Sequence, residues 1–311
     1  MTKREVEHEI TVDAPAAEVY RLIAEVENWP QIFPPSVYVD YADRGETEER
    51  IRIWATANGA AKNWVSKRVL DPENMSISFR QETPAHPVAE MGGTWIIEQR
   101  SERSSLVRLL HDYRAVDDDR EHLEWIDQAV DRNSRSELAS LKENVELATN
   151  EDLYMSFEDS MDISGSAKDV YDFLNEARLW EERLPHVATV SMTEDSPGVQ
   201  LLRMDTRTKD GSTHTTESVR VCFPNHKITY KQTTVPPLMT VHTGCWTLEE
   251  NEDGTTIATS QHTVVINADN IAGILGDDAG VTEARTFIRN ALGGNSRATL
   301  GYAKEHAEAR R

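Results

Sequence analysis

Two arginine–histidine pairs recur in the two halves of the chain. Arg68 is matched by Arg220, 152 residues later, and His111 is matched by His262, 151 residues later. A guanidinium can stabilise the negative charge that develops on a carbonyl oxygen, and an imidazole can exchange protons near neutral pH. We therefore treat all four side chains as candidate catalytic residues for acid–base chemistry on a carbonyl compound.

Serine, asparagine, glutamate and tryptophan side chains accompany these four residues. Trp29 recurs as Trp180 and Ser66 as Ser218, and the run Asn133-Ser134-Arg135 recurs as Asn295-Ser296-Arg297. Hydroxyl and amide groups can position oxygens or an ordered water, and tryptophan rings can form flat apolar walls. The candidate substrate-binding residues are Trp29, Trp64, Ser66, Asn133, Glu137, Trp180, Ser218 and Asn295.

The strand that carries the first arginine has one face on which both copies retain a serine and an arginine. Side chains alternate across a strand, so Trp64, Ser66 and Arg68 share a face. Lys67, on the other face, becomes Val219 in the second copy. Two interpretations remain open for Arg68. It either points into an interior cavity, where burial would require a carboxylate or polar partner, or it is an ordinary surface arginine.

The histidines and the long helical segment also allow two interpretations. Each histidine lies on an apolar strand, where the alternative to an acid–base group is a hydrogen-bonded core residue. A helical pattern from about 121 to 148 carries the stripe Ile126, Val130, Asn133, Glu137 and Leu141. The two polar members of this stripe either hydrogen-bond backbone groups across the gap between helix and sheet, or line a wet pocket.

The repeat has the length of a whole domain. A unit of about 150 residues is too long for a solenoid module and fits two successive domains, which we place at residues 1–148 and 152–311. Asn58-Gly59 and the matching Asp210-Gly211 are hairpin-turn signals. In the first copy, residues 15–26 predict a helix, and strands are predicted at about 8–13, 49–56, 61–70, 75–82, 92–99 and 105–115.

A sheet of this size must bury one face, and the long helix is the only element able to cover it. The predicted fold class is therefore α+β. Each copy is expected to be a curved, seven-stranded antiparallel sheet wrapped around a long C-terminal helix, with an interior cavity between them. These helices are expected at about 121–148 and 280–309.

The composition restricts the partners. With 33 Lys+Arg against 54 Asp+Glu, the net charge is −21, which argues against nucleic acid or an anionic membrane surface. The two isolated cysteines, Cys222 and Cys245, suit a reducing cytoplasm. The charged N-terminus and the lack of a long apolar run predict a cytoplasmic protein. Without a phosphate-binding loop or metal-ligand motif, we expect no cofactor and no metal.

Four short runs, taken together and in order, carry a family resemblance. They are Trp29-Pro30-Gln31-Ile32-Phe33-Pro34-Pro35, Trp64-Val65-Ser66-Lys67-Arg68 with Asp71-Pro72, His111-Asp112-Tyr113, and Arg132-Asn133-Ser134-Arg135. The first copy resembles the polyketide aromatase/cyclases of bacterial type II polyketide pathways, the tetracenomycin-type group. The second copy matches less fully but over its whole length. Tandem copies look like the di-domain subgroup, and the resemblance implies two helix-grip, START-like domains.

The resemblance also implies a reaction. An acyl carrier protein would deliver a linear poly-β-ketone, and the protein would direct first-ring aldol closure and dehydration, between C7 and C12 of a C9-reduced chain. In the family, the arginine at the position of Arg68 polarises or anchors a ketone. The histidine at the position of His111 serves as acid or base in one branch, where an acidic residue at the place of Glu137 assists. A non-catalytic carrier or chaperone for an apolar polyketide or lipid is the alternative.

The second copy departs from the pattern of the first at two pocket positions. It has Thr216 in place of Trp64 and Thr299 in place of Glu137. Since the first copy has the fuller aromatic and acidic lining, we expect residues 1–148 to be the catalytic copy.

Overall fold

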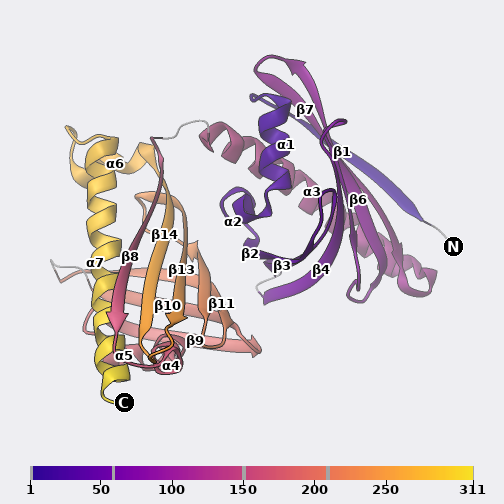
Figure 1. The fold of residues 1–311 in the computed structure, drawn as a ribbon. Helices are drawn as coiled ribbons and strands as arrows, with labels where there is room; N and C mark the ends of the chain where they lie inside the picture. The colour runs from indigo at the N-terminus through magenta and orange to yellow at the C-terminus, as the bar shows by residue number, and fades with distance from the viewer. Residues whose placement is uncertain (1–2, 58–59, 149–151, 208–210, 311) are drawn as a thin grey trace. The chain divides into compact units, whose positions relative to one another are not determined.

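Each half of the chain folds as a unit of its own (Figure 1). The computed structural model describes residues 3–57, 60–148, 152–207 and 211–310. The chain divides into Met1–Thr149 and Asn150–Arg311. Each unit contains one seven-stranded antiparallel sheet and a long C-terminal helix, so the predicted fold class is confirmed.

In the first domain the strands are hydrogen-bonded in the order β1-β7-β6-β5-β4-β3-β2. The elements are β1 (Arg4–Val12), α1 (Ala16–Ala24), η1 (Val26–Asn28), α2 (Trp29–Ile32), β2 (Ser36–Arg44), β3 (Glu48–Ala57), β4 (Ala60–Asp71), β5 (Ser76–Gln81), β6 (Val88–Ser101), β7 (Ser104–Ala115), η2 (Val116–Asp118) and α3 (Arg120–Ala148).

The second domain repeats this topology, with the order β8-β14-β13-β12-β11-β10-β9. Its elements are β8 (Tyr154–Ile163), α4 (Ala167–Asn175), η3 (Ala177–Leu179), α5 (Trp180–Arg183), β9 (Val187–Ser196), β10 (Val199–Arg207), β11 (Thr213–Phe223), β12 (Lys227–Thr234), β13 (Met239–Glu250), β14 (Thr256–Ile266), η4 (Ala268–Asn270), α6 (Ile271–Leu275) and α7 (Val281–Glu308).

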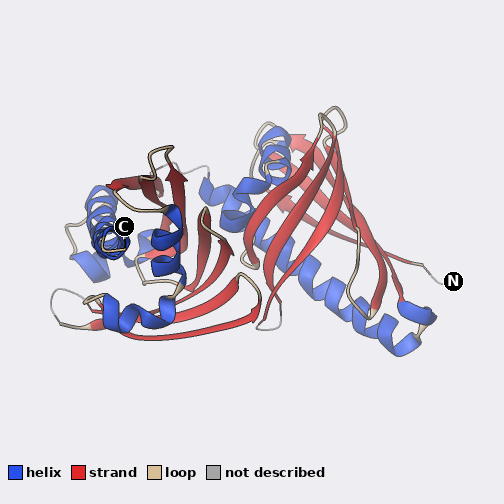
Figure 2. Cartoon of the chain, turned by 60° about the horizontal axis from the view of Figure 1, so that its bottom comes forward, coloured by secondary structure: helices blue, strands red, loops and turns tan. Residues whose placement is uncertain are grey.

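The long helix of each domain crosses one face of its sheet, as Figure 2 shows for the first domain. Helix α3 packs against β1 and β7, and α7 packs against β8 and β14. The buried stripe of α3 advances by fours through Ile126, Val130, Ser134 and Leu138. Asn133 is exposed, so its predicted place in the buried stripe is wrong. A step of three from Val130 turns it away from the sheet, and the next residue takes the inward position.

Strand β4 shows which face of the sheet is inward. Ser66 and Arg68 are buried, whereas Lys67 is exposed and Val69 is 45% exposed. The interpretation of Arg68 as a surface arginine is therefore wrong. Strands β3 and β4 pair up to Ala57 and Ala60. The predicted turn at Asn58-Gly59 and the Asp210 position of its counterpart lie outside the described residues.

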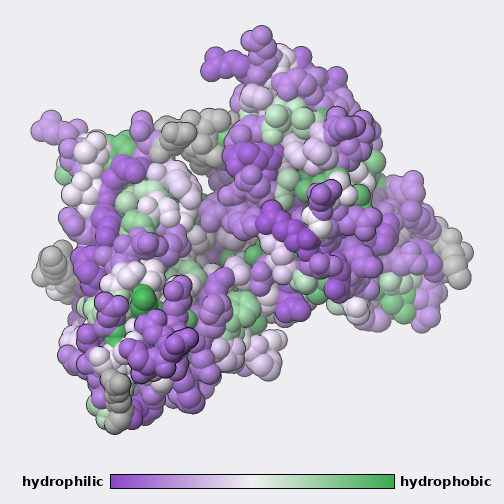
Figure 3. Space-filling view, in the orientation of Figure 1, coloured by the Kyte–Doolittle hydropathy of each residue, from purple (hydrophilic) through white to green (hydrophobic). Residues whose placement is uncertain are grey.

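The visible surface is mainly hydrophilic, with small scattered hydrophobic patches (Figure 3). This agrees with the high content of charged residues. Within the described part of the chain, no helix is long and apolar enough to cross a membrane.

Candidate active site

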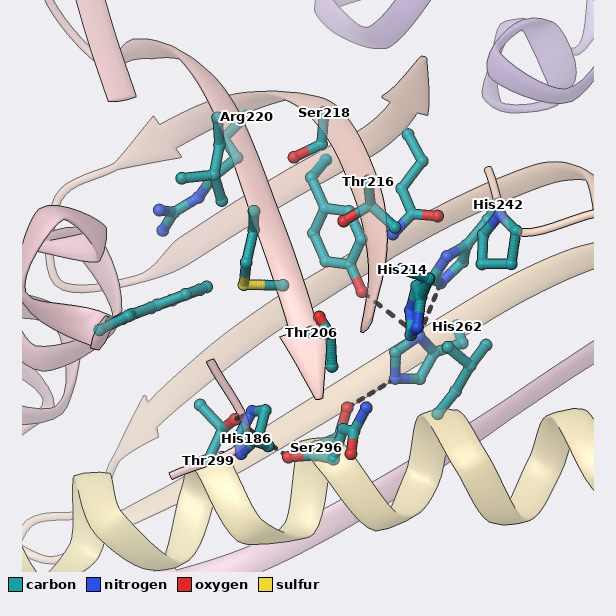
Figure 4. A pocket seen from close by; sticks show the side chains of 18 of the residues that line it. His186, Thr206, His214, Thr216, Ser218, Arg220, His242, His262, Ser296 and Thr299 are labelled. Carbon is teal, nitrogen blue, oxygen red and sulfur yellow. Dashed lines mark hydrogen bonds between the residues drawn. The ribbon is translucent and has the colours of Figure 1, made fainter. Parts of the chain in front are cut away.

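An interior pocket lies in the second domain, between the concave face of its sheet and α7 (Figure 4). The volume of this cavity is about 120 Å³. Its apolar wall includes Trp180, Leu202, Met204, Trp246 and Leu292. Its polar wall includes His186, His214, Ser218, Arg220, Tyr230, His242, His262, Asn295, Ser296 and Thr299.

The fold itself holds the arginine of this pocket. Arg220 is buried, and its Nη2 donates a hydrogen bond of 2.6 Å to the carbonyl oxygen of Leu174, in the last turn of α4. Its guanidinium carbon lies 5.1 Å from the centre of the Trp180 ring. The negative end of the helix dipole and the ring face both favour a cation there. Burial nevertheless lowers the pKa of Arg220, and among the described residues its Nη1 has no hydrogen-bond partner.

The matching arginine in the first domain has an additional partner. Arg68 Nη2 donates to the carbonyl oxygens of Ile23 (3.1 Å) and Ala24 (3.2 Å), at the end of α1. Its Nη1 lies 3.1 Å from Glu49 Oε1 in a buried ion pair. Burial raises the pKa of Glu49, and the neighbouring Arg68 opposes that rise. The second domain has Gln200 at the place of Glu49, so its arginine lacks this carboxylate.

His262 forms the centre of a hydrogen-bonded network in the second-domain pocket. Its Nε2 lies 2.7 Å from Ser296 Oγ and 3.3 Å from Ser260 Oγ. Its Nδ1 lies 2.9 Å from His242 Nε2 and 3.2 Å from Tyr230 Oη. Desolvation lowers the pKa of His262 to about 4 and that of His242 well below its usual value. Both imidazoles are therefore neutral at pH 7.

A glycine makes room for the tyrosine of this network. Gly244 of β13 is paired with Tyr230 of β12, and a Cβ at Gly244 would overlap the phenol ring. The ring can therefore lie flat across the neighbouring strand and bring its hydroxyl to His262.

The first domain has fewer hydrogen bonds at the matching histidine, His111. His111 Nδ1 lies 3.3 Å from Ser134 Oγ, and the Phe79 ring meets the imidazole edge-on with 5.5 Å between ring centres. Burial lowers the pKa of His111 to about 4. Desolvation raises the pKa of the half-buried Glu137 on α3 to about 7. Its carboxyl group thus titrates near neutrality, as a proton-transfer group should.

The remaining predicted residues occupy varied positions. Ser66 Oγ donates to the carbonyl oxygen of Arg80 at 3.2 Å, which ties its hydroxyl to the neighbouring strand. Trp29 donates its indole N–H to the carbonyl oxygen of Ile23, the same atom that receives Arg68. Trp64 is half-buried. Trp180, Ser218 and Asn295 line the second-domain pocket.

Sequence reasoning missed several pocket residues. Tyr230 and His242 were missed because the first copy has Phe79 and Met91 at the matching places, so a search for retained polar residues rejects them. Ser134 and Ser296 could have been found. They are the central residues of the repeated Asn-Ser-Arg run, and an i+4 stripe selects them. The described residues contain no group of three or more His, Cys, Asp or Glu that could hold a metal ion.

Comparisons with known proteins place both halves in one family. The family model described as "Polyketide cyclase / dehydrase and lipid transport" matches residues 3–146 and 154–308. The granaticin polyketide synthase bifunctional cyclase/dehydratase of Streptomyces virginiae is 51% identical over 300 residues, covering 96% of this chain and 98% of that protein. The actinorhodin polyketide synthase bifunctional cyclase/dehydratase of Streptomyces coelicolor is 42% identical, covering 96% and 95%.

Two solved structures match the chain over nearly its whole length. The di-domain ARO/CYC BexL from the BE-7585A biosynthetic pathway is 65% identical, with a TM-score of 0.94 and coverage of 99% of this chain and 100% of that one. The di-domain ARO/CYC StfQ from the steffimycin biosynthetic pathway is 34% identical, with a TM-score of 0.88 and coverage of 98% and 99%.

Proposed function

The chain belongs to the polyketide cyclase/dehydrase and lipid transport family, and we propose that it closes and dehydrates a ring of a poly-β-ketone inside its second-domain pocket. It is an enzyme of polyketide cyclisation and dehydration, as its motifs predicted. The alternative of a non-catalytic carrier is not favoured, because relatives that match almost the entire chain are named as cyclase/dehydratases.

The separation of two chemical groups within one pocket carries this proposal. In the view of Figure 4, Arg220 lies on one side of the pocket, and His242, His262 and Ser296 lie on the other. Arg220 contacts no carboxylate of the described residues, and such a cation suits the oxygen of an enolate or aldolate. Neutral imidazoles and hydroxyls suit proton transfer to and from carbon and oxygen. A bent chain that spans both groups would have its reacting carbons held in one register.

We propose that the first domain is less suited to the same step, although the sequence led us to expect residues 1–148 to be the catalytic copy. Glu49 neutralises Arg68 through the buried ion pair, so less positive potential remains for a ligand oxygen. We therefore propose that Arg220 and the hydrogen-bonded network centred on His262 are the principal catalytic groups. Arg68 and His111, with Glu137, form a second, weaker candidate site.

An acyl carrier protein is the proposed donor of the substrate. Two of the relatives named above are components of polyketide synthases, where intermediates are bound to such carriers. Closure between C7 and C12 of a ketoreduced chain is the proposed regiochemistry. Both points would be read from the products formed when the protein is supplied with a minimal polyketide synthase and a ketoreductase.

That reconstituted system also tests the proposed site. The wild type should yield the cyclised, aromatised product, and Arg220→Met should shift the products to spontaneous cyclisation mixtures. Arg68→Met, matched in chemistry, should retain more of the wild-type product once corrected for the amount of folded protein. An Arg220→Met variant with an unchanged product spectrum would refute the assignment of the site.

A further inference from the structure

Both ring nitrogens of His262 are engaged by protein groups. Ser296 and Ser260 surround its Nε2, and His242 and Tyr230 surround its Nδ1. The imidazole therefore has no free nitrogen for a ligand. Tyr230, His242 and Ser296 line the pocket beside His262. Figure 4 shows the hydrogen bonds converging on His262.

The protons in this network can be counted. Each neutral imidazole carries one ring proton, and the 2.9 Å contact between His242 Nε2 and His262 Nδ1 needs a proton on one of the two atoms. When His262 carries its proton on Nδ1, its Nε2 accepts from the Ser296 hydroxyl. When His262 carries it on Nε2, that nitrogen donates to Ser296. A change of tautomer at His262 thus couples the Tyr230 hydroxyl to the Ser296 hydroxyl.

We propose, on the basis of the function proposed above, that Tyr230 is the pocket-facing proton donor for water elimination and that Ser296 accepts the proton from carbon. His262 passes a proton between these two hydroxyls. His242 acts as a positioning residue, because its Nε2 holds the His262 proton on Nδ1 before the reaction. We call these four residues the relay.

The elimination balances through the relay. The C–H bond next to the ketone breaks and its proton passes to Ser296 Oγ, while the Ser296 hydroxyl proton moves to His262 Nε2. The His262 Nδ1 proton moves to the Tyr230 oxygen, and the Tyr230 proton moves to the departing hydroxyl. The C–O bond breaks, the electron pair of the C–H bond becomes the new C=C bond, and water leaves. The enzyme ends with the same number of protons and with His262 in its other tautomer. No proton then lies between His262 Nδ1 and His242 Nε2, which are 2.9 Å apart, so the repulsion of the two lone pairs favours the return of His262 to its starting tautomer by proton exchange with water.

The relay is a property of the second domain. The first domain has Phe79 in place of Tyr230 and Met91 in place of His242, and it retains only the contact between His111 and Ser134. These natural replacements supply the test variants Tyr230→Phe and His242→Met, since the same fold accepts them at the same strand positions. Tyr171→Phe is the matched control, because it removes a hydroxyl from a core residue that does not line the pocket.

The test uses the full chain and a synthetic aldol adduct, a 3-hydroxycyclohexanone with a β-ketothioester side chain. Release of water is followed by mass spectrometry. Tyr230→Phe and Ser296→Ala should each slow this step by about 10²- to 10⁴-fold, the usual contribution of a general acid or base. Tyr171→Phe should match the wild type. A Tyr230→Phe rate within about twofold of the Tyr171→Phe rate overturns the relay.

A spectroscopic measurement tests the positioning residue separately. In protein labelled with ¹⁵N-histidine, the His262 ring shifts should report one tautomer, with the proton on Nδ1. His242→Met should convert this to a mixture, whereas Tyr171→Phe should not. An unchanged tautomer in His242→Met overturns the role of His242. A wild type that leaves the adduct intact refutes the proposed function itself. An active wild type with an equally active Tyr230→Phe refutes the relay alone.

Discussion

The variant Arg68→Met should destabilise the first domain more than Arg220→Met destabilises the second. Removing Arg68 leaves the Glu49 carboxylate buried without its cation, and such a loss costs about 3–5 kcal/mol. Removing Arg220 leaves the Leu174 carbonyl without its donor, which costs about 1–3 kcal/mol. Hence the two arginines, equivalent in the repeat, should differ by about 2 kcal/mol.

The double variant Arg68→Met/Glu49→Gln tests whether the buried charge of Glu49 causes this difference in stability. Glu49→Gln gives the first domain the residue that the second domain has at Gln200. In Arg68→Met/Glu49→Gln no charge remains buried at this place, so about 2 kcal/mol of the loss should return. The loss in the single variant should also shrink as the pH falls toward 4. Burial already raises the pKa of Glu49, and without Arg68 the carboxyl group protonates still more readily.

Hydrogen exchange read by mass spectrometry is the suitable assay, because two domains need not unfold in one transition. Peptides from α1 and α4 report each site within the intact chain. Equal protection losses for Arg68→Met and Arg220→Met, with no recovery in the double variant, would refute the reasoning from the ion pair. Activity lost in Arg68→Met should be interpreted only after this measurement.

Three further predictions concern buried titratable groups and the packing of α7 against its sheet. The pKa of Glu137 is about 7 in the folded chain, above its usual 4.5, so its contribution to stability is complete below pH 4.5 and is lost as the pH rises through 7. Glu137→Gln should therefore raise the free energy of unfolding by about 1–3 kcal/mol at pH 8 and leave it unchanged at pH 4, as read from denaturant titrations. The pKa values of His111 and His262 are about 4, below their usual 6.5; their stabilising effect is present above pH 6.5 and is lost as the pH falls through 4. His262→Gln should flatten the loss of stability in this range, and an equally steep profile would contradict it. A Cβ at Gly293 would overlap the Arg289 guanidinium, which pairs with Asp159 of β8. Gly293→Ala should therefore raise hydrogen exchange in α7 and β8, while Gly294→Ala, with open space around its Cβ, should not.

Hydrophobic periodicity, together with turn signals and the internal repeat, predicted most elements of the fold. The expected helices at 121–148 and 280–309 are found at Arg120–Ala148 and Val281–Glu308, because a long stripe against a sheet is a strong signal. The repeat also provided a second sequence for each strand, so that the pattern of one copy could be checked against the other. The retention of Ser66 and Arg68 in both copies agrees with their burial on the inward face of β4, although the sequence alone left a surface position open for Arg68.

The polar site was less predictable. The spacing of apolar residues does not decide which of two neighbouring residues on a helix faces the sheet. Asn133 was therefore placed in the buried stripe, where Ser134 lies. The partner of Arg68 could not be predicted either. Glu49 lies opposite it on the neighbouring strand β3, and the sequence does not give the register in which two strands pair. Retention in both copies favours residues that hold the fold. It overlooks Tyr230 and His242, which occur in one copy only.

The two copies show how one fold can divide its chemistry. In each, a buried arginine donates to a carbonyl oxygen at the end of the domain's first helix and lies beside a tryptophan ring, so this residue helps to hold the fold of both domains. The second copy has Gln200 in place of Glu49, so Arg220 lacks the carboxylate that pairs with Arg68. Exchanging Phe79 and Met91 for Tyr230 and His242 then adds proton-transfer groups across the same sheet. In the proposed site, the retained Arg220, His262 and Ser296 therefore act together with Tyr230 and His242, which only the second copy has.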